Sequence, residues 1–123
     1  MASHNDFGKK AEDLAVDFLK EKEYTILARN FRFQKSEIDI IAEKDNLIIF
    51  TEVKARSTDV FLLPQEAVDK KKIKSIVFAA NNYLEKFNKN NEVRFDIIAV
   101  LRNEKEKLLI NHITDAFEAL DAH

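Results

Sequence analysis

The stretch 37–54, EIDIIAEKDNLIIFTEVK, most limits what this chain can fold into. Its two runs of β-branched and aromatic residues, 38–42 and 47–53, flank the polar pair Asp45-Asn46. Short apolar runs on either side of two turn-forming residues are typical of a β-hairpin, and asparagine tolerates the positive φ that a two-residue loop requires. The sequence therefore predicts two antiparallel strands joined by Asp45 and Asn46.

The same loop sets the register of the hairpin and brings charged residues together. Counted from a two-residue loop, Asp39 lies opposite Glu52, and Glu37 lies opposite Lys54. Side chains alternate between the faces of a strand, so all four point to one face. Two facing carboxylates, about 5 Å apart, repel each other unless a cation lies between them. Mg²⁺ or Mn²⁺ binds such oxygen ligands, and a metal beside the Lys54 ammonium suits chemistry at phosphate.

A solvated charged face is the competing interpretation of these residues. Charged and apolar residues alternate on any half-exposed strand, and the tripeptide Glu52-Val53-Lys54 is a weak signal alone. Ile48 and Phe50, however, share the face of Glu52. A helix should cover that apolar face, which would place the charged end of the hairpin at the edge of a core. The register therefore favours a functional site.

Composition places the chain among small single domains, here residues 1–123. Of its 123 residues, 46% are hydrophobic, 10% are aromatic and none is cysteine. That content can fill one core, and it excludes a disulfide framework and thiolate metal sites. No run has the length of a membrane-spanning helix and no signal-peptide pattern is present, so a cytoplasmic protein is expected. The formal net charge of −2 means that nucleic acid would have to bind to a local basic patch.

The remaining segments predict two helices, three more strands and two tails. Apolar residues at helical spacing, and β-type runs separated by polar turns, give these assignments. The expected elements are a helix from residue 7 to about residue 22, strands at 24–33, 93–101 and 107–113, a second helix after Pro64 with Asp69 as its N-cap, a flexible tail at 1–6 and a C-terminal tail at 114–123. With the hairpin, the order is helix, three strands, helix, two strands. This order predicts an α/β or α+β fold, a mixed five-stranded sheet flanked by helices.

The second helix begins with a basic cluster. Four lysines lie in its first turns, where they oppose the helix dipole. They are Lys70, Lys71, Lys72 and Lys74. This unfavourable placement suggests that the lysines have a function, for example binding a phosphate backbone, although lysine runs often serve only to keep a protein soluble. The apolar face of this helix is expected to comprise Ile73, Ile76, Val77, Ala80, Leu84 and Phe87.

A series of short motifs is spread over nearly the whole chain. They are Gly8-Lys9, Ala11-Glu12, ILARNFR at 26–32, EIDIIA at 37–42, FTEVKAR at 50–56, PQEAV at 64–68, Lys72, Ala79-Ala80, Tyr83-Leu84 and Arg94-Phe95-Asp96. In these positions the chain resembles the YraN-like family of small bacterial proteins, which is uncharacterised and endonuclease-like, within the PD-(D/E)XK nuclease superfamily. Archaeal Holliday-junction resolvases look similar in the same places. The resemblance implies a restriction-endonuclease-like fold, with a mixed sheet flanked by helices.

The resemblance also implies roles for the hairpin and the first helix. Asp39 and Glu52 match the metal-binding carboxylates, and the backbone carbonyl of Val53 would be a further ligand. Lys54 matches the lysine that orients or activates the attacking water and stabilises charge on the phosphate. Glu12, which by itself would be an ordinary acid near a helix N-terminus, matches the acid that completes the metal site.

Other charged residues take supporting roles in the same resemblance. Glu37 matches an acid that precedes the family's aspartate, without a defined role. Four cationic residues would bind substrate phosphates, namely Arg29, Arg32, Arg56 and Lys72. The family usually has glycine where this chain has Ser36, and another near Leu62, so the chain departs from the pattern in loops near the site.

These expectations describe a Mg²⁺- or Mn²⁺-dependent endonuclease that hydrolyses phosphodiester bonds in DNA, of branched or otherwise special structure. Similarity to resolvases also implies a homodimer. Two other functions stay open: a non-catalytic nucleic-acid-binding module on a nuclease-like fold, and a protein–protein adaptor that uses the apolar tip 61–63 of the loop 56–64. The crowded acids favour the enzyme, because a module that only binds phosphate has no need of them.

Overall fold

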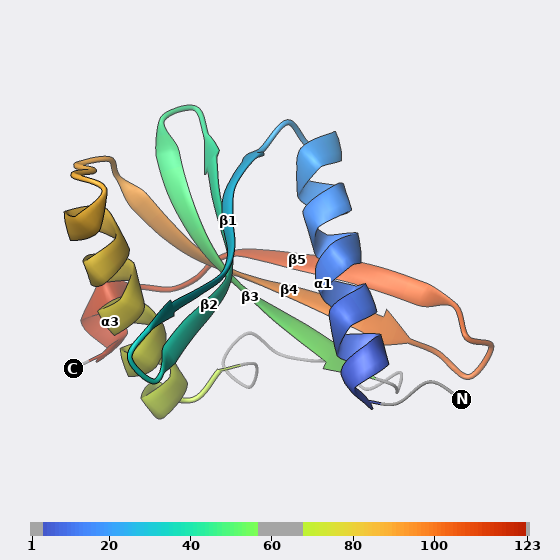
Figure 1. Ribbon diagram of the computed structural model, residues 1–123. Helices are drawn as coiled ribbons and strands as arrows, with labels where there is room; N and C mark the ends of the chain where they lie inside the picture. Colours follow the sequence, from blue (N-terminus) through green and yellow to red (C-terminus); the bar gives the residue numbers. More distant parts are fainter. Residues whose placement is uncertain (1–3, 57–67, 123) are drawn as a thin grey trace.

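The computed structural model describes residues 4–56 and 68–122. Its elements follow the predicted order (Figure 1). They are α1 (His4–Glu21), β1 (Thr25–Phe33), β2 (Ser36–Lys44), β3 (Leu47–Arg56), α3 (Lys70–Lys86), β4 (Val93–Arg102), β5 (Leu108–Phe117) and the short 3₁₀ helix η1 (Ala119–Ala122). The five strands form one sheet in the order β1-β2-β3-β4-β5. The predicted α+β fold, a mixed five-stranded sheet with two helices, is confirmed.

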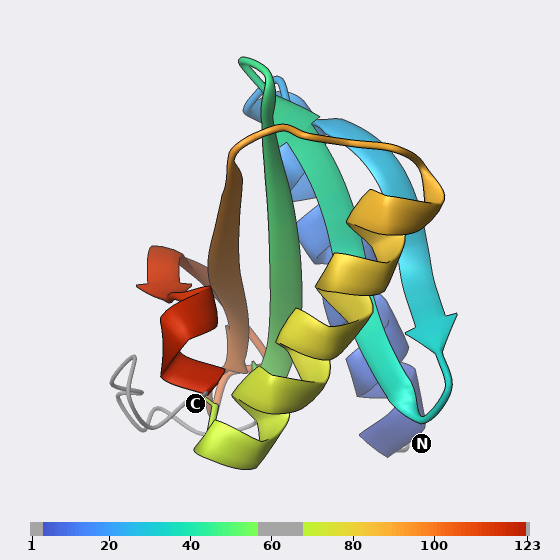
Figure 2. The ribbon, with the colours of Figure 1, turned by 90° about the vertical axis from the view of Figure 1, so that its left-hand side faces the viewer.

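The direction of the strands explains where the helices lie. β3 and β4 run parallel, whereas the other neighbouring strands run antiparallel. A parallel neighbour requires a crossover connection, and α3 lies in the segment between β3 and β4. α1 and α3 pack on opposite faces of the twisted sheet (Figures 1 and 2).

Each helix buries its own apolar layer against the sheet. On the α1 side, Leu19 packs in a cluster with Ile40 and Ile98, all of them fully buried. On the α3 side, Phe50 of β3 lies with its ring centroid 6.0 Å from that of Tyr83. Burying each of these large side chains contributes about 1.5–3 kcal/mol. The predicted helical cover over Ile48 and Phe50 is therefore α3.

Two details of the helices differ from the prediction. α1 begins at His4, so residues 4–6 are helical and the expected tail at 1–6 is wrong there. Its first turn contains Asp6, an acid that the helix dipole favours at this end. On α3, Asp69 is the predicted N-cap, but Phe87 is the C-cap residue and is 48% exposed. Tyr83, which the helical pattern missed, is buried in its place.

The C-terminal segment also differs from the prediction. β5 runs to Phe117 and η1 follows it, so the expected tail at 114–123 is wrong for residues 114–122. The backbone N–H of Asp115 donates to Oδ1 of Asp96 at 2.9 Å. The ring of Phe117 stacks on that of Phe95, with the centroids 5.1 Å apart. These two contacts attach the last part of β5 to β4.

The apolar tip 61–63 and Pro64 lie outside the described residues. Of the loop 56–64, the structure describes only Arg56, at the end of β3. Within residues 4–56 and 68–122, no helix has the length and apolarity to cross a membrane.

Candidate metal and phosphate site

The hairpin has the predicted loop, and its register follows the prediction as far as the pair of Ile40 and Thr51. Asp45 and Asn46 have φ values of 52° and 67°, as a two-residue loop of type I′ requires. From this loop the pairing of β2 with β3 continues without a shift to Ile40 and Thr51. Both strands therefore bring their charged ends to the same level of the sheet.

The regular pairing ends one position before Asp39 and Glu52. There, Oδ2 of Asp39 accepts a hydrogen bond of 2.8 Å from the backbone N–H of Val53. The carboxylate thus occupies the place of the backbone carbonyl that would accept from this N–H in a continued ladder. Asp39 is therefore anchored to β3, the strand that carries Glu52.

Glu52 is buried, and two lysines lie next to it. Its Oε1 is 3.7 Å from Nζ of Lys72 and 3.9 Å from Nζ of Lys54. The Glu52 side chain is only 7% exposed, whereas those of Lys54 and Lys72 are 23% and 40% exposed. The structure thus brings together three of the predicted site residues, from β3 and the first turn of α3.

Both carboxyl groups are held in surroundings that oppose their ionisation. Burial, followed by repulsion from Asp39, raises the pKa of Glu52 from 4.5 to about 7. Burial also raises the pKa of Asp39, with smaller contributions from the carboxylates of Glu12 and Glu37. The Val53 hydrogen bond and Lys72 oppose the shift of Asp39, and Lys72 and Lys54 oppose that of Glu52, but neither shift is cancelled. A further positive charge at this position would be stabilised.

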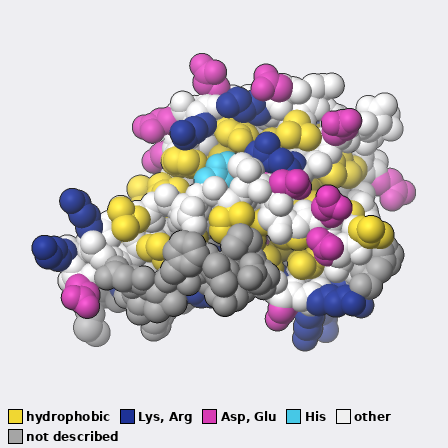
Figure 3. All heavy atoms as spheres, turned by 180° about the vertical axis from the view of Figure 1, so that it is seen from behind, with side chains coloured by type: hydrophobic (Ala, Val, Ile, Leu, Met, Phe, Trp, Pro, Cys, Tyr) yellow, Lys and Arg dark blue, Asp and Glu magenta, His cyan; other side chains and the backbone are white. Residues whose placement is uncertain are grey.

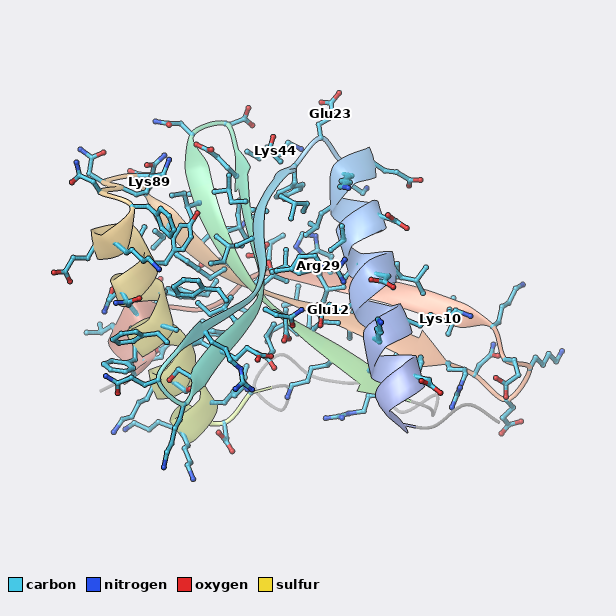
Figure 4. All side chains as sticks on the ribbon, in the orientation of Figure 1. Lys10, Glu12, Glu23, Arg29, Lys44 and Lys89 are labelled. Carbon is cyan, nitrogen blue, oxygen red and sulfur yellow. The ribbon has the colours of Figure 1, made fainter. Side chains whose placement is uncertain are left out.

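Two side chains of β1 hold Glu12, which lies on α1. Its Oε1 accepts hydrogen bonds from Nδ2 of Asn30 at 2.8 Å and from Nη2 of Arg29 at 3.3 Å. Figure 4 shows Glu12 and Arg29 side by side between the helix and the sheet. The charge of Glu12 also contributes to the raised pKa of Asp39.

The two predicted phosphate-binding arginines of β1 are paired with acids. Arg29 donates to Oδ1 of Asp13 at 2.6 Å, and this hydrogen bond is the main cause that raises the pKa of the guanidinium. Nε of Arg32 donates to Oε2 of Glu37 at 2.8 Å. Both arginines are therefore already paired with acidic side chains of the same chain.

The other two predicted phosphate-binding residues, Arg56 and Lys72, line a pocket at the junction of β3 and α3. The pocket has a volume of about 510 Å³. Its full lining comprises Lys54, Arg56, Val68, Asp69, Lys71, Lys72 and Ser75. Four of these side chains are cationic, so the pocket is suited to phosphate. By contrast, Lys and Arg are mixed with Asp and Glu among the described side chains on the face drawn in Figure 3.

The donor set fits a hard divalent cation, without forming a complete cage. In the described part of the chain, no group of three or more His, Cys, Asp or Glu side chains is arranged to hold a metal ion. Mg²⁺ commonly takes only one or two carboxylates and completes its shell with waters and substrate oxygens. Asp39 and Glu52 are the two carboxylates that could take this role.

A second polar cluster was missed in the sequence. Asp96 is fully buried, and its carboxylate accepts hydrogen bonds of 2.8 Å from Nε and Nη2 of Arg94. Nε2 of His112 lies 2.8 Å from its Oδ2, and Arg94 also donates to the hydroxyl of Tyr24 at 2.9 Å. Burial raises the pKa of Asp96, but the hydrogen bonds outweigh it and hold that pKa below its ordinary value. The sequence feature that could have revealed this cluster is the spacing of Arg94 and Asp96, which lie two positions apart and so share one face of the strand.

Comparison with known proteins places the chain in a family. Residues 11–100 match the model of the "Uncharacterised protein family UPF0102". A "UPF0102 protein" of Christiangramia forsetii is 52% identical over 117 residues, which cover 95% of this chain and 98% of the relative. One of Bacteroides thetaiotaomicron is 46% identical over 117 residues, with 95% and 96% covered. The chain therefore belongs to the uncharacterised protein family UPF0102, which is the YraN-like family that its motifs resemble.

Proposed function

We propose that this protein is a Mg²⁺- or Mn²⁺-dependent endonuclease that hydrolyses phosphodiester bonds in DNA, with branched or otherwise structured DNA as its substrate. The observation that carries the proposal is the pairing of buried Glu52 with Lys54 and Lys72 beside Asp39. Two buried carboxylates that repel each other, next to two ammonium groups, lower the stability of the fold. The same arrangement is useful at a site that binds both a metal ion and a phosphate.

Each residue would have a role that follows from its position in the site. Asp39, Glu52 and the backbone carbonyl of Val53 would hold the metal. When bound, a divalent cation lowers the pKa of a coordinated water and neutralises charge on the scissile phosphate. Lys54, whose Nζ is 3.9 Å from Glu52, would orient the water and stabilise negative charge on the phosphate.

The cationic pocket supports the same proposal from the substrate side. Arg56 and Lys71 line it together with Lys54 and Lys72, the two lysines that lie within 4 Å of Glu52. Phosphates next to the scissile bond would lie in this pocket and fix the register of the strand. We assign substrate binding to this pocket rather than to Arg29 and Arg32, because those arginines already hold Glu12, Asp13 and Glu37.

Calorimetric titration of Mn²⁺ into the wild type and Asp39→Asn tests the proposal without a guess about substrate. Asparagine keeps an oxygen that can accept from the N–H of Val53, so the variant should fold. Binding in the wild type that Asp39→Asn abolishes would support the metal site, and cleavage of a panel of branched DNAs would then test the reaction. If the wild type bound no Mn²⁺, either alone or with DNA present, the enzyme would be excluded.

A non-catalytic nucleic-acid-binding module is the second candidate. The cationic pocket favours it, because a pocket of this kind can bind phosphate without any metal. The two candidates differ in their response to Asp39→Asn. A module of this kind should bind DNA more tightly when the repulsive charge is removed, whereas an enzyme should lose its metal and its cleavage.

The homodimer and the cytoplasmic location stay predictions. β1 and β5 are the two edges of the sheet, and β5 has no Lys, Arg, Asp or Glu from 108 to 114. Charges are a common means of keeping an edge strand from pairing, so β5 is the edge more open to a second copy. Sedimentation equilibrium of the purified protein tests this, and a monomer at all concentrations would exclude the dimer.

A further inference from the structure

Asn30 has an unusual backbone for a strand residue. It lies in the middle of β1, yet its φ is 51°, in the left-handed region that asparagine tolerates better than most residues. The pairs Arg29–Ile40 and Phe31–Ile38 join β1 to β2 on either side of it. The position between these two pairs is that of Asn30 and Asp39. The irregular residue therefore lies level with a proposed metal ligand.

Both strands change the face to which their side chains point at this level. Ile38 packs in the cluster under α3, whereas Ile40, two residues later, packs in the cluster under α1. On β1, Arg29 reaches acids of α1, but Phe31 packs against Tyr83 of α3. In a regular strand, residues two positions apart share a face. The interruption therefore occurs in β1 and β2 together, around Asn30 and Asp39.

The interruption lets two consecutive residues of β1 contact α1. In a regular strand Asn30 would point to the face opposite that of Arg29. Instead, Nδ2 of Asn30 donates to Oε1 of Glu12 at 2.8 Å, a shorter contact than the 3.3 Å between Arg29 and the same oxygen. Arg29 makes its shortest hydrogen bond with Asp13, at 2.6 Å. Asn30 is therefore the closer hydrogen-bond donor to Glu12.

We propose that Asn30 is a positioning residue, which holds the Glu12 carboxylate so that it can bind a water of a divalent cation held by Asp39 and Glu52. This inference rests on the proposed function and adds a residue to it. The two hydrogen bonds to Glu12 both fall on Oε1. These bonds leave Oε2 of Glu12 for a water of the cation. A strained backbone that is retained at such a point is typical of functional sites.

Asn30→Gly tests the proposal, because glycine accepts the left-handed backbone and removes only the amide. Asn88→Gly is the matched control, since Asn88 also has a φ of 51° but lies in the turn after α3. Mn²⁺ affinity would be measured by calorimetry for both variants, for Glu12→Gln and for the double variant Asn30→Gly/Glu12→Gln. Thermal unfolding without metal would accompany each titration.

We expect Asn30→Gly to weaken Mn²⁺ binding about tenfold, the lower end of the range for residues that hold a metal ligand in place. Glu12→Gln should weaken it at least as much, the double variant should lose no more than Glu12→Gln alone, and Asn88→Gly should bind as the wild type does. Wild-type affinity in Asn30→Gly, or a full additional loss in the double variant, would overturn the proposal. Failure of the wild type to bind Mn²⁺ would instead count against the proposed function.

Discussion

Val53 and Asp39 are joined by a hydrogen bond of 2.8 Å at the point where the pairing of β2 and β3 ends. The backbone of one strand thus holds the carboxylate of the other. This bond fixes Asp39 relative to Glu52 and Lys54, which flank Val53 in β3. The acid is therefore positioned by the fold itself, before any ligand is present.

Asp39→Ala and Asp39→Asn should separate this structural role from metal binding. Asparagine can still accept the Val53 N–H, whereas alanine leaves it without a partner in a part-buried position. We expect alanine to lower the free energy of unfolding by about 1–3 kcal/mol relative to asparagine. Urea unfolding measures this difference. Equal stability of the two variants would show that the hydrogen bond contributes little.

Glu52→Gln should change how stability depends on pH. The pKa of Glu52 is about 7 in the folded protein, above its ordinary value of 4.5. The folded state therefore holds the proton more tightly than the unfolded state, and the wild type loses stability as pH rises from about 4.5 to 7. Glutamine mimics the protonated form, so the variant should be more stable than the wild type at pH 8, by up to about 3 kcal/mol.

Urea unfolding of both proteins at pH 5 and pH 8, without metal, checks this expectation. At pH 5 the advantage of Glu52→Gln should fall to about a quarter of its value at pH 8, and Mn²⁺ at pH 8 should stabilise the wild type alone. An advantage of equal size at both pH values would contradict the raised pKa of Glu52.

Asp96→Asn should be strongly destabilising. Asp96 is fully buried and accepts from Arg94, from the Asp115 N–H and at His112. Removing the negative charge leaves the Arg94 guanidinium without its ion pair, at a cost of about 3–5 kcal/mol. Thermal unfolding measures the loss. Asp115→Asn is the control, because Asp115 takes part through its backbone N–H and its side chain is exposed. Similar losses in both variants would refute the role of the Asp96 charge.

Lys71→Ala should weaken DNA binding and reduce the dependence of the DNA affinity on salt concentration. Lys71 lines the cationic pocket, whereas Lys105 lies exposed in the turn between β4 and β5. Removing one phosphate contact lowers the slope of log K against log salt by about 1. Fluorescence anisotropy with a branched DNA at several salt concentrations measures this slope. If Lys105→Ala reduced it equally, the pocket would not be the binding surface.

The hairpin could be predicted because its information is local. Asp45 and Asn46 select a two-residue loop, and the register that follows places Asp39 and Glu52 at one level. The order of elements followed in the same way from period and turn residues. The end of the ladder before Asp39 could not be predicted, because a side chain competing for the N–H of Val53 leaves no mark in a two-residue period.

The parts that were missed depend on contacts between distant segments. Asn30 takes a left-handed backbone in a run that otherwise reads as a regular strand, and its partner Glu12 lies 18 positions away. β5 extends beyond its predicted end because Phe117 packs on Phe95. Arg29 and Arg32 were assigned to phosphate from the resemblance, and only the geometry reveals their acidic partners.

The parallel pairing of β3 with β4 has a consequence for folding. β1, β2 and β3 form a meander of neighbouring strands, whose contacts close short loops and can form early. β4 joins β3 only after α3 has crossed over, which is a slower, non-local step. Asp39, Glu52 and Lys54 belong to the first unit, but Lys72 arrives with the second. In that order of events, Asp39 and Glu52 come together before Lys72, which lies 3.7 Å from Glu52 in the folded protein, is in place.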